Sequence, residues 1–193
     1  MNDMIVCKKV DRTYFPQYDA IPMLVHVSSY YRIEKLNRGL GGFTLVETAT
    51  EPYTKDMGIF EIASEYEDQF DITNWAVFMA FDREKAVGGA TVAARTKEVN
   101  MLSGRDDLAV LWDIRVEDDY KRQGIGQALF DTAVKWSKSQ GLVQMKIECQ
   151  NNNVQACRFY HKQGAFLCAV DEYAYFNEPE YRQEVQLIWF LDL

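Results

Sequence analysis

The sequence predicts an α/β fold in which helices pack on a mixed β-sheet, and two features carry this prediction. Segments with the apolar pattern of strands occur at 75–81, 87–94, 108–116 and 143–149. Amphipathic segments with helical spacing begin at Ile125 and at Asn153. Strands that alternate with helices in this order indicate a mixed α/β sheet.

Length and composition indicate one globular domain. The chain has 193 residues, with 48% hydrophobic and 26% charged residues. No repeat or low-complexity linker interrupts it, so we expect a single domain over 1–193. Its apolar runs are far shorter than the ~20 residues that span a bilayer, and no signal peptide is evident. We therefore predict a cytoplasmic protein without membrane contact.

The charge and the cysteines exclude some classes of partner. The net charge is −8, which argues against nucleic-acid binding and favours cationic partners. The four cysteines lack metal-ligand spacing, so we expect reduced thiols and no metal. Whether the protein forms a homodimer stays open at this point.

The first seventy residues have weaker patterns. An early strand is predicted between Met23 and Ile33, and an extended segment at 43–46 follows three glycines. The acidic segment 61–70 is predicted as a short helix.

The segment 75–116 predicts three strands. Residues 75–81 and 87–94 form a hairpin around a turn at 82–85. In the third strand, strict alternation would divide the side chains between two faces. Leu108, Val110, Trp112, Ile114 and Val116 would share one face, and Ala109, Leu111, Asp113 and Arg115 the other.

The remaining elements alternate between helix and strand. The helix from Ile125 carries the apolar stripe Leu129, Ala133 and Trp136, and Gly141 is its predicted C-terminal cap. A strand at 143–149 precedes a helix that runs from an asparagine cap to about Gln163. Two final strands, at 166–176 and 185–191, are predicted on either side of a polar loop.

The most informative segment joins the strand at 108–116 to the helix from Ile125. It reads Lys121-Arg122-Gln123-Gly124-Ile125-Gly126. Glycines let a backbone approach a ligand closely, and unpaired N–H groups at a helix start favour an anion. The two basic residues add positive charge, so the segment predicts a pyrophosphate site. Its spacing matches neither the dinucleotide fingerprint nor the P-loop.

This segment resembles the cofactor motif of the GNAT superfamily of N-acetyltransferases, in which Gln or Arg stands three residues before the first glycine. Gly124 and Gly126 match, whereas Lys121 replaces the Gln or Arg. Residues 153–164 resemble a second motif of the family, and Asn153, Ala156, Tyr160 and Gly164 match its positions. The resemblance covers 75–193 and implies the GNAT fold, a mixed central sheet of six to seven strands flanked by helices.

The resemblance implies acetyl-CoA as cosubstrate and assigns its binding residues. Backbone amides of Lys121, Arg122, Gln123, Gly124, Ile125, Gly126 and Gln127 would hold the pyrophosphate, and Ile114 and Val116 would pair with the pantetheine arm. Asn153 would either contact the pantetheine or only cap its helix. The region 1–70 would lie on the acceptor side, because family members draw acceptor specificity from this region.

The chemistry requires an acid and a base. An amine of pKa about 10.4 must lose a proton before it attacks a thioester, and the departing thiolate needs a proton. Tyr160 matches the general acid of the family and is also assigned to the acetyl-CoA site; the alternative is a tyrosine that only packs between helix and sheet. Asp113 and Glu148 are candidates for the base, and Asp171 and Glu172 could likewise bind a cationic substrate or relay a proton. Each of these carboxylates is more often solvated or paired. Cys149, Cys157 and Cys168 lie within apolar patterns, so we expect inert thiols and direct transfer.

The chain also resembles one subgroup, the streptothricin acetyltransferases, which acetylate the β-lysine amine of a cationic antibiotic. The resemblance lies in the run 113–126, in Gly164-Ala165-Phe166, where Ala165 displaces the usual phenylalanine, and in the aromatic segment 171–176. The candidate acceptor residues are Asp171, Glu172, Tyr173 and Tyr175, with the two tyrosines on one strand face facing an amine. Core packing is the equal alternative for these tyrosines. Acetylation of a protein N-terminus, a lysine or a polyamine stays open, as does an acyl-CoA-binding module without activity.

Overall fold

The main sheet has seven strands in the order β1-β4-β5-β6-β7-β9-β8, in a computed structural model that describes residues 5–193. The strands are β1 Val6–Val10, β4 Ala76–Asp82, β5 Lys85–Ala94, β6 Leu108–Val116, β7 Gln144–Gln150, β8 Phe166–Asp171 and β9 Gln186–Asp192. The β6–β7 pair is parallel, whereas β1–β4, β4–β5, β5–β6 and β8–β9 are antiparallel. The predicted mixed α/β sheet is confirmed.

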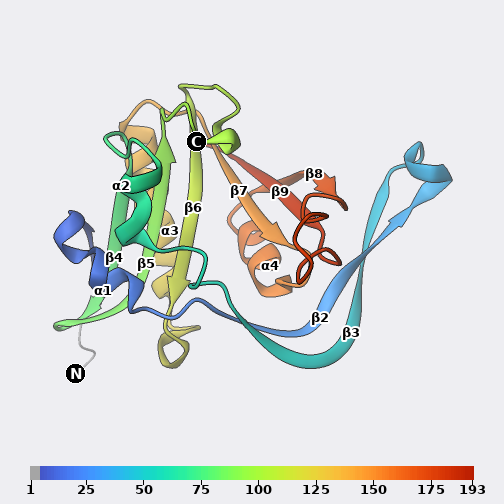
Figure 1. The fold of residues 1–193 in the computed structure, drawn as a ribbon, viewed down its shortest axis with the longest axis horizontal. Coiled ribbons are helices and arrows are strands. Elements are labelled where there is room, and N and C mark those ends of the chain that lie inside the picture. The colour runs from blue at the N-terminus through green and yellow to red at the C-terminus, as the bar shows by residue number, and fades with distance from the viewer. Residues whose placement is uncertain (1–4) are drawn as a thin grey trace. The chain divides into compact units, whose positions relative to one another are not determined.

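The other elements within residues 5–193 are four α-helices, five short 3-10 helices and a separate ribbon. The α-helices are α1 Phe15–Asp19, α2 Tyr66–Gln69, α3 Ile125–Ser139 and α4 Val154–Lys162. The strands β2 Leu24–Lys35 and β3 Phe43–Asp56 pair as a long two-stranded ribbon (Figure 1). The structure divides into two compact units. The first comprises the chain up to Leu24, Asp56–Ile147 and Leu191–Leu193, and the second comprises Val25–Lys55 and Glu148–Phe190.

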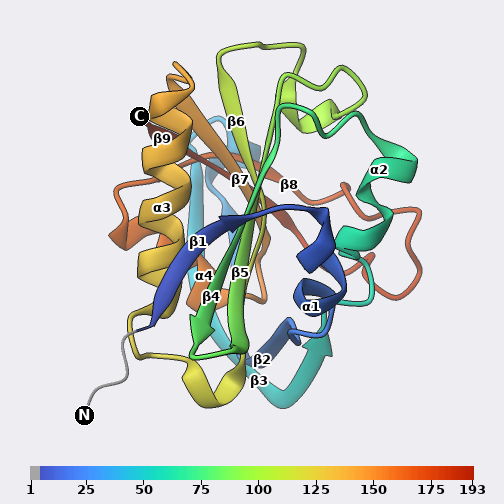
Figure 2. The same cartoon turned by 90° about the vertical axis from the view of Figure 1, so that its left-hand side faces the viewer.

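In the first unit, helices cover both faces of the β4–β5 hairpin (Figure 2). The helix α3 lies on one face, and α1 and α2 lie on the other. Two adjacent glycines of β5 allow this close packing from both sides. A Cβ on Gly89 would lie 2.3 Å from the Tyr18 ring of α1, and one on Gly88 would lie 3.0 Å from Leu129 of α3. The predicted stripe of α3 is buried at Leu129 and Ala133, and Gly141 with φ +74° follows its end as predicted.

The predicted alternation of side chains along β6 is wrong, because the strand contains a β-bulge. Thr91 of β5 pairs with Asp113, but the next residue, Val92, pairs with Leu111, so Trp112 is an extra residue in β6. The extra residue moves Leu108 and Val110 to the face of Asp113 and Arg115. Asp113 and Ile114 do lie on opposite faces, as predicted.

In the second unit, asparagines organise the junction between β7 and α4. The Asn153 side chain accepts a hydrogen bond from Ala156 N at 3.2 Å, which makes it the N-cap of α4. Asn151 exchanges bonds with Val185 before β9 and with Tyr31 of β2. The predicted strand at 166–176 ends earlier, at Asp171, whose carboxylate accepts a bond from Tyr173 N at 2.8 Å. This local turn diverts the chain from the sheet, so Tyr173 and Tyr175 lie in a loop and share no strand face.

The N-terminal region contains more structure than its pattern indicates. The strand predicted from Met23 is confirmed as β2, and the extended segment at 43–46 is the start of β3. The strand β1 and the helix α1 had not been predicted. The acidic segment 61–70 forms two short helical turns, the second of which is α2.

Candidate functional site

The loop between β6 and α3 is shaped by backbone conformations that favour glycine. Arg122 has φ 61° and Gly124 has φ 87°, and α3 begins directly afterwards at Ile125. The loop therefore turns sharply and presents the first turn of a fifteen-residue helix.

Backbone amides of this loop are available to an anion. Within residues 5–193, the N–H groups of Arg122, Gln123, Gly124, Ile125 and Gly126 have no hydrogen-bond acceptor. Unpaired amides at the start of a long helix, with its positive dipole end, are a suitable cradle for a pyrophosphate. The residues present therefore fit the pyrophosphate of acetyl-CoA.

Lys121 differs from the rest of the predicted amide set. Its N–H donates to Asp118 O at 3.1 Å, and its Nζ donates to Leu24 O at 2.8 Å and pairs with Asp118 Oδ1 at 2.5 Å. At the other end of the set, the Gln127 side chain donates to Asp131 Oδ1 at 2.8 Å within α3. The backbone N–H and the ammonium group of Lys121 are thus both bonded to other groups of the protein.

Half of one edge of β6 has no partner strand. The pairing of β6 with β7 runs only from Leu108 to Leu111. In the described part of the chain, the residues 113–116 pair with β5 on one side, and the stretch 112–116 pairs with no strand on the other. This edge includes Ile114 and Val116, the two residues predicted to pair with the pantetheine arm. An extended ligand could use the backbone groups of such an edge as a neighbouring strand does.

Asp113 lies in a buried network on the opposite side of β6 from Ile114. The residue is 2% exposed, and its carboxylate pairs with Arg115 at 2.5 Å and accepts a bond from the Tyr18 hydroxyl at 2.9 Å. Burial raises the pKa of the Asp113 carboxyl, and the Arg115 guanidinium offsets part of that rise. A side chain so enclosed and paired has the environment of a structural ion pair.

Arg115 had been noted only as a strand residue, yet it is the hub of this network. Its guanidinium also donates to Ile21 O at 3.2 Å and to Glu61 O at 2.8 Å. Asp113 and Arg115 are two positions apart on one strand, a spacing that predicts a pair on the same face. Their carbonyl partners are distant in sequence and left no local signal.

In the second unit, α4 carries Tyr160 of the second family motif, and Asn153 precedes its first residue. Tyr160 is buried, with 6% exposure, and its ring lies 5.6 Å from that of Phe159. Asn153 forms the cap described above, so its side-chain oxygen is already used. The structure thereby supports the capping alternative for Asn153.

The Glu148 side chain of β7 is bonded to Tyr175, one of the residues predicted to contact the amine substrate. The Tyr175 hydroxyl donates to Glu148 Oε1 at 2.6 Å, and Gln150 Nε2 donates to the same hydroxyl at 3.4 Å. Burial, and then the nearby Glu148 carboxylate, raise the pKa of Tyr175. Tyr175 therefore stays a neutral donor that fixes the orientation of the Glu148 carboxylate.

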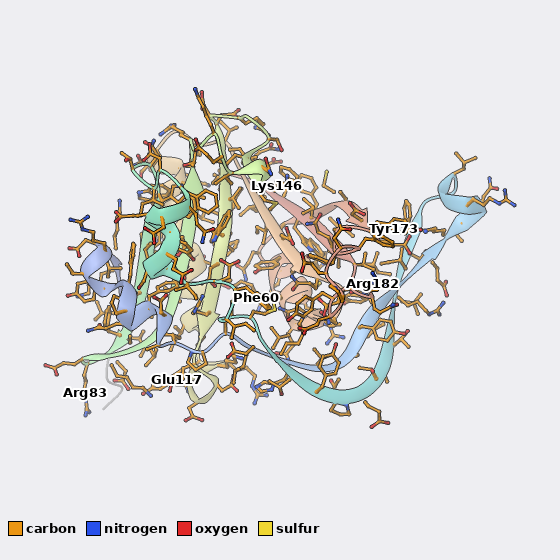
Figure 3. All side chains as sticks on the ribbon, in the orientation of Figure 1. Phe60, Arg83, Glu117, Lys146, Tyr173 and Arg182 are labelled. Carbon is orange, nitrogen blue, oxygen red and sulfur yellow. The ribbon has the colours of Figure 1, made fainter. Side chains whose placement is uncertain are left out.

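The other residues predicted to contact the amine substrate have other surroundings than Tyr175 and Glu148. The Glu172 carboxylate forms an ion pair with Lys35, and Asp171 closes the turn at Tyr173. The Tyr173 side chain is 73% exposed, in the same β8–β9 loop as Arg182 (Figure 3). Tyr173 and Tyr175 thus have different environments.

A polar network in the second unit had no sequence signal. Lys55 and Glu184 form an ion pair at 2.5 Å with side chains only 10% and 12% exposed. Asn152 Nδ2 donates to Glu184 Oε1 at 3.0 Å and to the Tyr53 hydroxyl at 2.9 Å. These partners are between 32 and 129 residues apart in the chain.

The thiols correct one expectation. Cys149 and Cys157 are buried as expected, with their sulfur atoms 3.4 Å apart. The hydrogen bond with Cys157, and then burial, raise the pKa of the Cys149 thiol. Cys168, however, is exposed, because β8 is open to solvent at this position. The thiolate form of Cys149 is disfavoured, which agrees with direct transfer.

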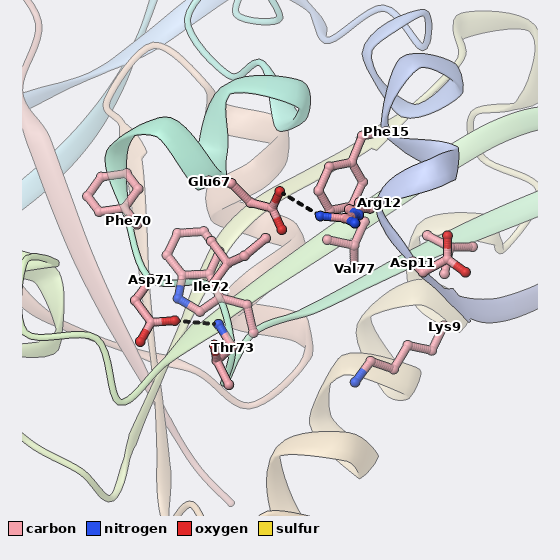
Figure 4. Close-up of a pocket in the computed structure, with 12 residues that line it drawn as sticks. Lys9, Asp11, Arg12, Phe15, Glu67, Phe70, Asp71, Ile72, Thr73 and Val77 are labelled. Carbon is pink, nitrogen blue, oxygen red and sulfur yellow. Dashed lines mark hydrogen bonds and ion pairs between the residues drawn. The ribbon is translucent and has the colours of Figure 1, made fainter.

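A shallow depression of about 600 Å³ lies on the first unit, beside α1 and α2 (Figure 4). Arg12 and Glu67 pair across it at 3.7 Å, and the Asp71 carboxylate accepts a bond from Thr73 N. None of the predicted site residues lines it. Its charged groups have partners within the protein, as on an ordinary surface: Asp11 accepts a bond from Thr13 N, and Lys9 lies over the Trp136 ring.

Two further features of the described residues concern metals and membranes. Among residues 5–193, no cluster of three or more His, Cys, Asp or Glu side chains has the arrangement to hold a metal ion. No helix of this part of the chain is long and apolar enough to cross a membrane.

The mixed sheet and the amide-lined loop before α3 define an α/β protein with a site for a pyrophosphate. Residues 44–165 match the acetyltransferase (GNAT) family, which is more than half of the chain. The chain belongs to this family and is an N-acetyltransferase that uses acetyl-CoA.

Relatives and solved structures agree with this membership. The chain is 29% identical to a streptothricin acetyltransferase of Escherichia coli over 77% of this chain and 76% of the relative. It is 33% identical to streptothricin acetyltransferase A of Bacillus subtilis, over 48% of this chain and 53% of the relative.

Two solved structures have the same fold. One, from Bacillus anthracis str. Ames, is assigned as a streptothricin acetyltransferase and was solved with acetyl coenzyme A. Its TM-score is 0.78 at 20% identity, covering 100% of this chain and 99% of the other. A nourseothricin acetyltransferase has a TM-score of 0.76 at 20% identity, covering 97% and 98%. The predicted resemblance to the family and to this subgroup is confirmed.

Proposed function

We propose that the protein transfers the acetyl group of acetyl-CoA to a primary amine of streptothricin, on its β-lysine moiety, and thereby confers resistance. The observation that carries the proposal is the match of about three quarters of the chain to a streptothricin acetyltransferase. The net charge of −8 suits a cationic acceptor. A protein N-terminus, a lysine or a polyamine is the alternative acceptor.

The amides after Lys121 would bind the pyrophosphate, and the free edge of β6 would align the pantetheine arm. Acetyl-CoA supplies a thioester whose carbonyl carbon accepts the amine nitrogen. As the C–N bond forms and the C–S bond breaks, the amine loses a proton and the thiolate gains one. Direct transfer within a ternary complex fits buried Cys149 and Cys157 thiols.

Between the two candidate bases, the contacts favour Glu148. Its carboxylate is oriented by Tyr175 and keeps Oε2 for an ammonium or a water. Asp113 is enclosed in its ion pair with Arg115. We therefore assign proton acceptance to Glu148, and protonation of the leaving thiolate to Tyr160.

The test mixes the protein with acetyl-CoA and streptothricin and follows release of free thiol, with spermidine and a lysine peptide in parallel. Fast release with streptothricin alone is the expected result. Release with spermidine or the peptide alone would contradict the proposed acceptor, though not the acetyltransferase activity.

The role of Tyr160 has its own variant. Tyr160→Phe should lower kcat about a hundredfold, because a positioned acid contributes about 10²- to 10⁴-fold. Tyr14→Phe is the control, since within residues 5–193 the Tyr14 hydroxyl has a hydrogen bond only from Lys8, at 3.4 Å, and lies outside every predicted site. An unchanged kcat in Tyr160→Phe, with acetyl-CoA binding intact, would refute the role.

A further inference from the structure

Two chain segments of the first unit are fastened to side chains of β6. They are residues 21–24, just before and at the start of β2, and residues 57–61, just after β3. We call these two segments the collar. Met57 N donates to Met23 O at 3.0 Å, so the two halves of the collar are bonded to each other.

Side chains of β6 hold the collar at several points. Arg115 donates to a carbonyl in each half, Ile21 O and Glu61 O. Trp112 Nε1 donates to Glu61 Oε2 at 2.8 Å. The collar therefore lies along the stretch 112–115, whose neighbouring edge is free for the pantetheine arm. It also exposes Ile59, at 62%, within the region 1–70 that the family resemblance places on the acceptor side.

Lys121 adds the link between the collar and the cofactor loop. Its Nζ bonds to Leu24 O and to Asp118, and its own N–H is used by Asp118 O. None of its polar groups is directed to the amide cradle that follows. Arg122, the next residue, has no bonded partner among the described residues, and its side chain is exposed.

We propose that Lys121 is a positioning residue for the acceptor: it fixes the collar through Leu24 and takes no part in binding the pyrophosphate. Arg122 alone of the two basic residues adds charge to the pyrophosphate site. The acceptor part of this inference rests on the proposed acetyltransfer to an amine, whereas the assignment of the two cations does not.

The test compares Lys121→Met with Arg122→Met, two neutralisations of adjacent cations. Calorimetry gives the Kd for acetyl-CoA, and steady-state kinetics give KM and kcat for the amine that the enzyme accepts. Lys121→Met should leave the acetyl-CoA Kd within about twofold and raise the acceptor KM about five- to tenfold, with kcat nearly unchanged, since a bond to a charged donor is lost. Arg122→Met should weaken acetyl-CoA binding about three- to tenfold and leave the acceptor KM unchanged.

Hydrogen exchange at the Met57 amide gives a readout that needs no acceptor. This amide should exchange faster in Lys121→Met, and at the wild-type rate in Arg122→Met and in Lys121→Arg, which keeps a donor for Leu24 O. An acetyl-CoA Kd weakened as much in Lys121→Met as in Arg122→Met, with Met57 exchange unchanged, would overturn the proposal. If streptothricin is not acetylated at all, the exchange rates and the two Kd values still decide the role of Lys121.

Discussion

Asp113 shows how the surroundings of a single residue decide between two roles that its type allows. Its carboxylate is paired with Arg115 and bonded to Tyr18, with both ion-pair side chains fully inaccessible. A carboxylate in this position contributes mainly by compensating a buried guanidinium. Removing its charge would leave Arg115 buried without a counter-charge.

We therefore expect Asp113→Asn to reduce the free energy of unfolding by about 3–5 kcal/mol. Urea denaturation followed by tryptophan fluorescence measures this change. A matched control is Asp107→Asn, because Asp107 pairs with Arg105 at the same spacing on the surface, where the side chains are 36% and 52% exposed. Asp107→Asn should leave the midpoint of urea denaturation almost unchanged. A large loss of kcat in Asp113→Asn without loss of stability would instead indicate the base.

At the scale of the element, the start of α3 depends on one glycine more than on the other. Gly124 has φ +87°, a conformation that costs a residue with a Cβ about 1–2 kcal/mol. Gly126 has no such φ, and a Cβ there would meet only Val116 Cγ2 at 3.8 Å. The two glycines of the motif thus serve different purposes, one for the turn and one for access.

Gly124→Ala should therefore destabilise the protein by about 1–2 kcal/mol and weaken acetyl-CoA binding, because the amides after it would be reoriented. Gly126→Ala should keep the wild-type stability or gain slightly, since alanine favours a helix. Urea denaturation and calorimetric titration with acetyl-CoA measure both effects. Equal stability of the two variants would contradict this account of the loop.

Elements with a local cause were predictable, and elements with a distant cause were not. The strands from Ala76 onward and both long helices follow from apolar spacing, caps and glycines within a few residues. The bulge at Trp112 was missed because an extra apolar residue leaves the apolar pattern intact. The end of β8 at Asp171 was missed because an aspartate that turns the chain resembles any polar strand residue.

The candidate site divides in the same way. The glycine loop is one continuous segment, so its amide cradle could be located from the sequence. The engagement of Lys121 by Leu24 depends on a contact 97 residues away, and that of Arg115 by Ile21 on one 94 residues away. Such contacts form only when the chain has folded. The surroundings of Lys121 and Asp113 therefore could not be predicted from their residue types.

At the scale of the whole molecule, the buried Tyr18 and Tyr66 and the half-buried Tyr175 make stability depend on alkaline pH. Burial is the largest cause that raises the pKa of Tyr18, Tyr66 and Tyr175 above the ordinary value of 10.0. The unfolded chain releases these protons near pH 10, while the folded protein retains them. The unfolded state then binds fewer protons, so the free energy of unfolding must fall as pH rises above 10.

Tyr66→Phe isolates one of these contributions, because the Tyr66 hydroxyl is buried and has no hydrogen-bond partner among residues 5–193. At pH 8 the variant should be as stable as the wild type or slightly more stable, since it buries one unsatisfied group fewer. Above pH 10 its stability should fall less steeply, by up to about 1.4 kcal/mol per pH unit, the contribution of a single proton. Urea midpoints between pH 8 and pH 11.5 measure both slopes. If stability fell with pH at the same slope in both proteins, Tyr66 would ionise as readily in the folded state as in the unfolded chain. Its burial would then contribute nothing to the alkaline instability.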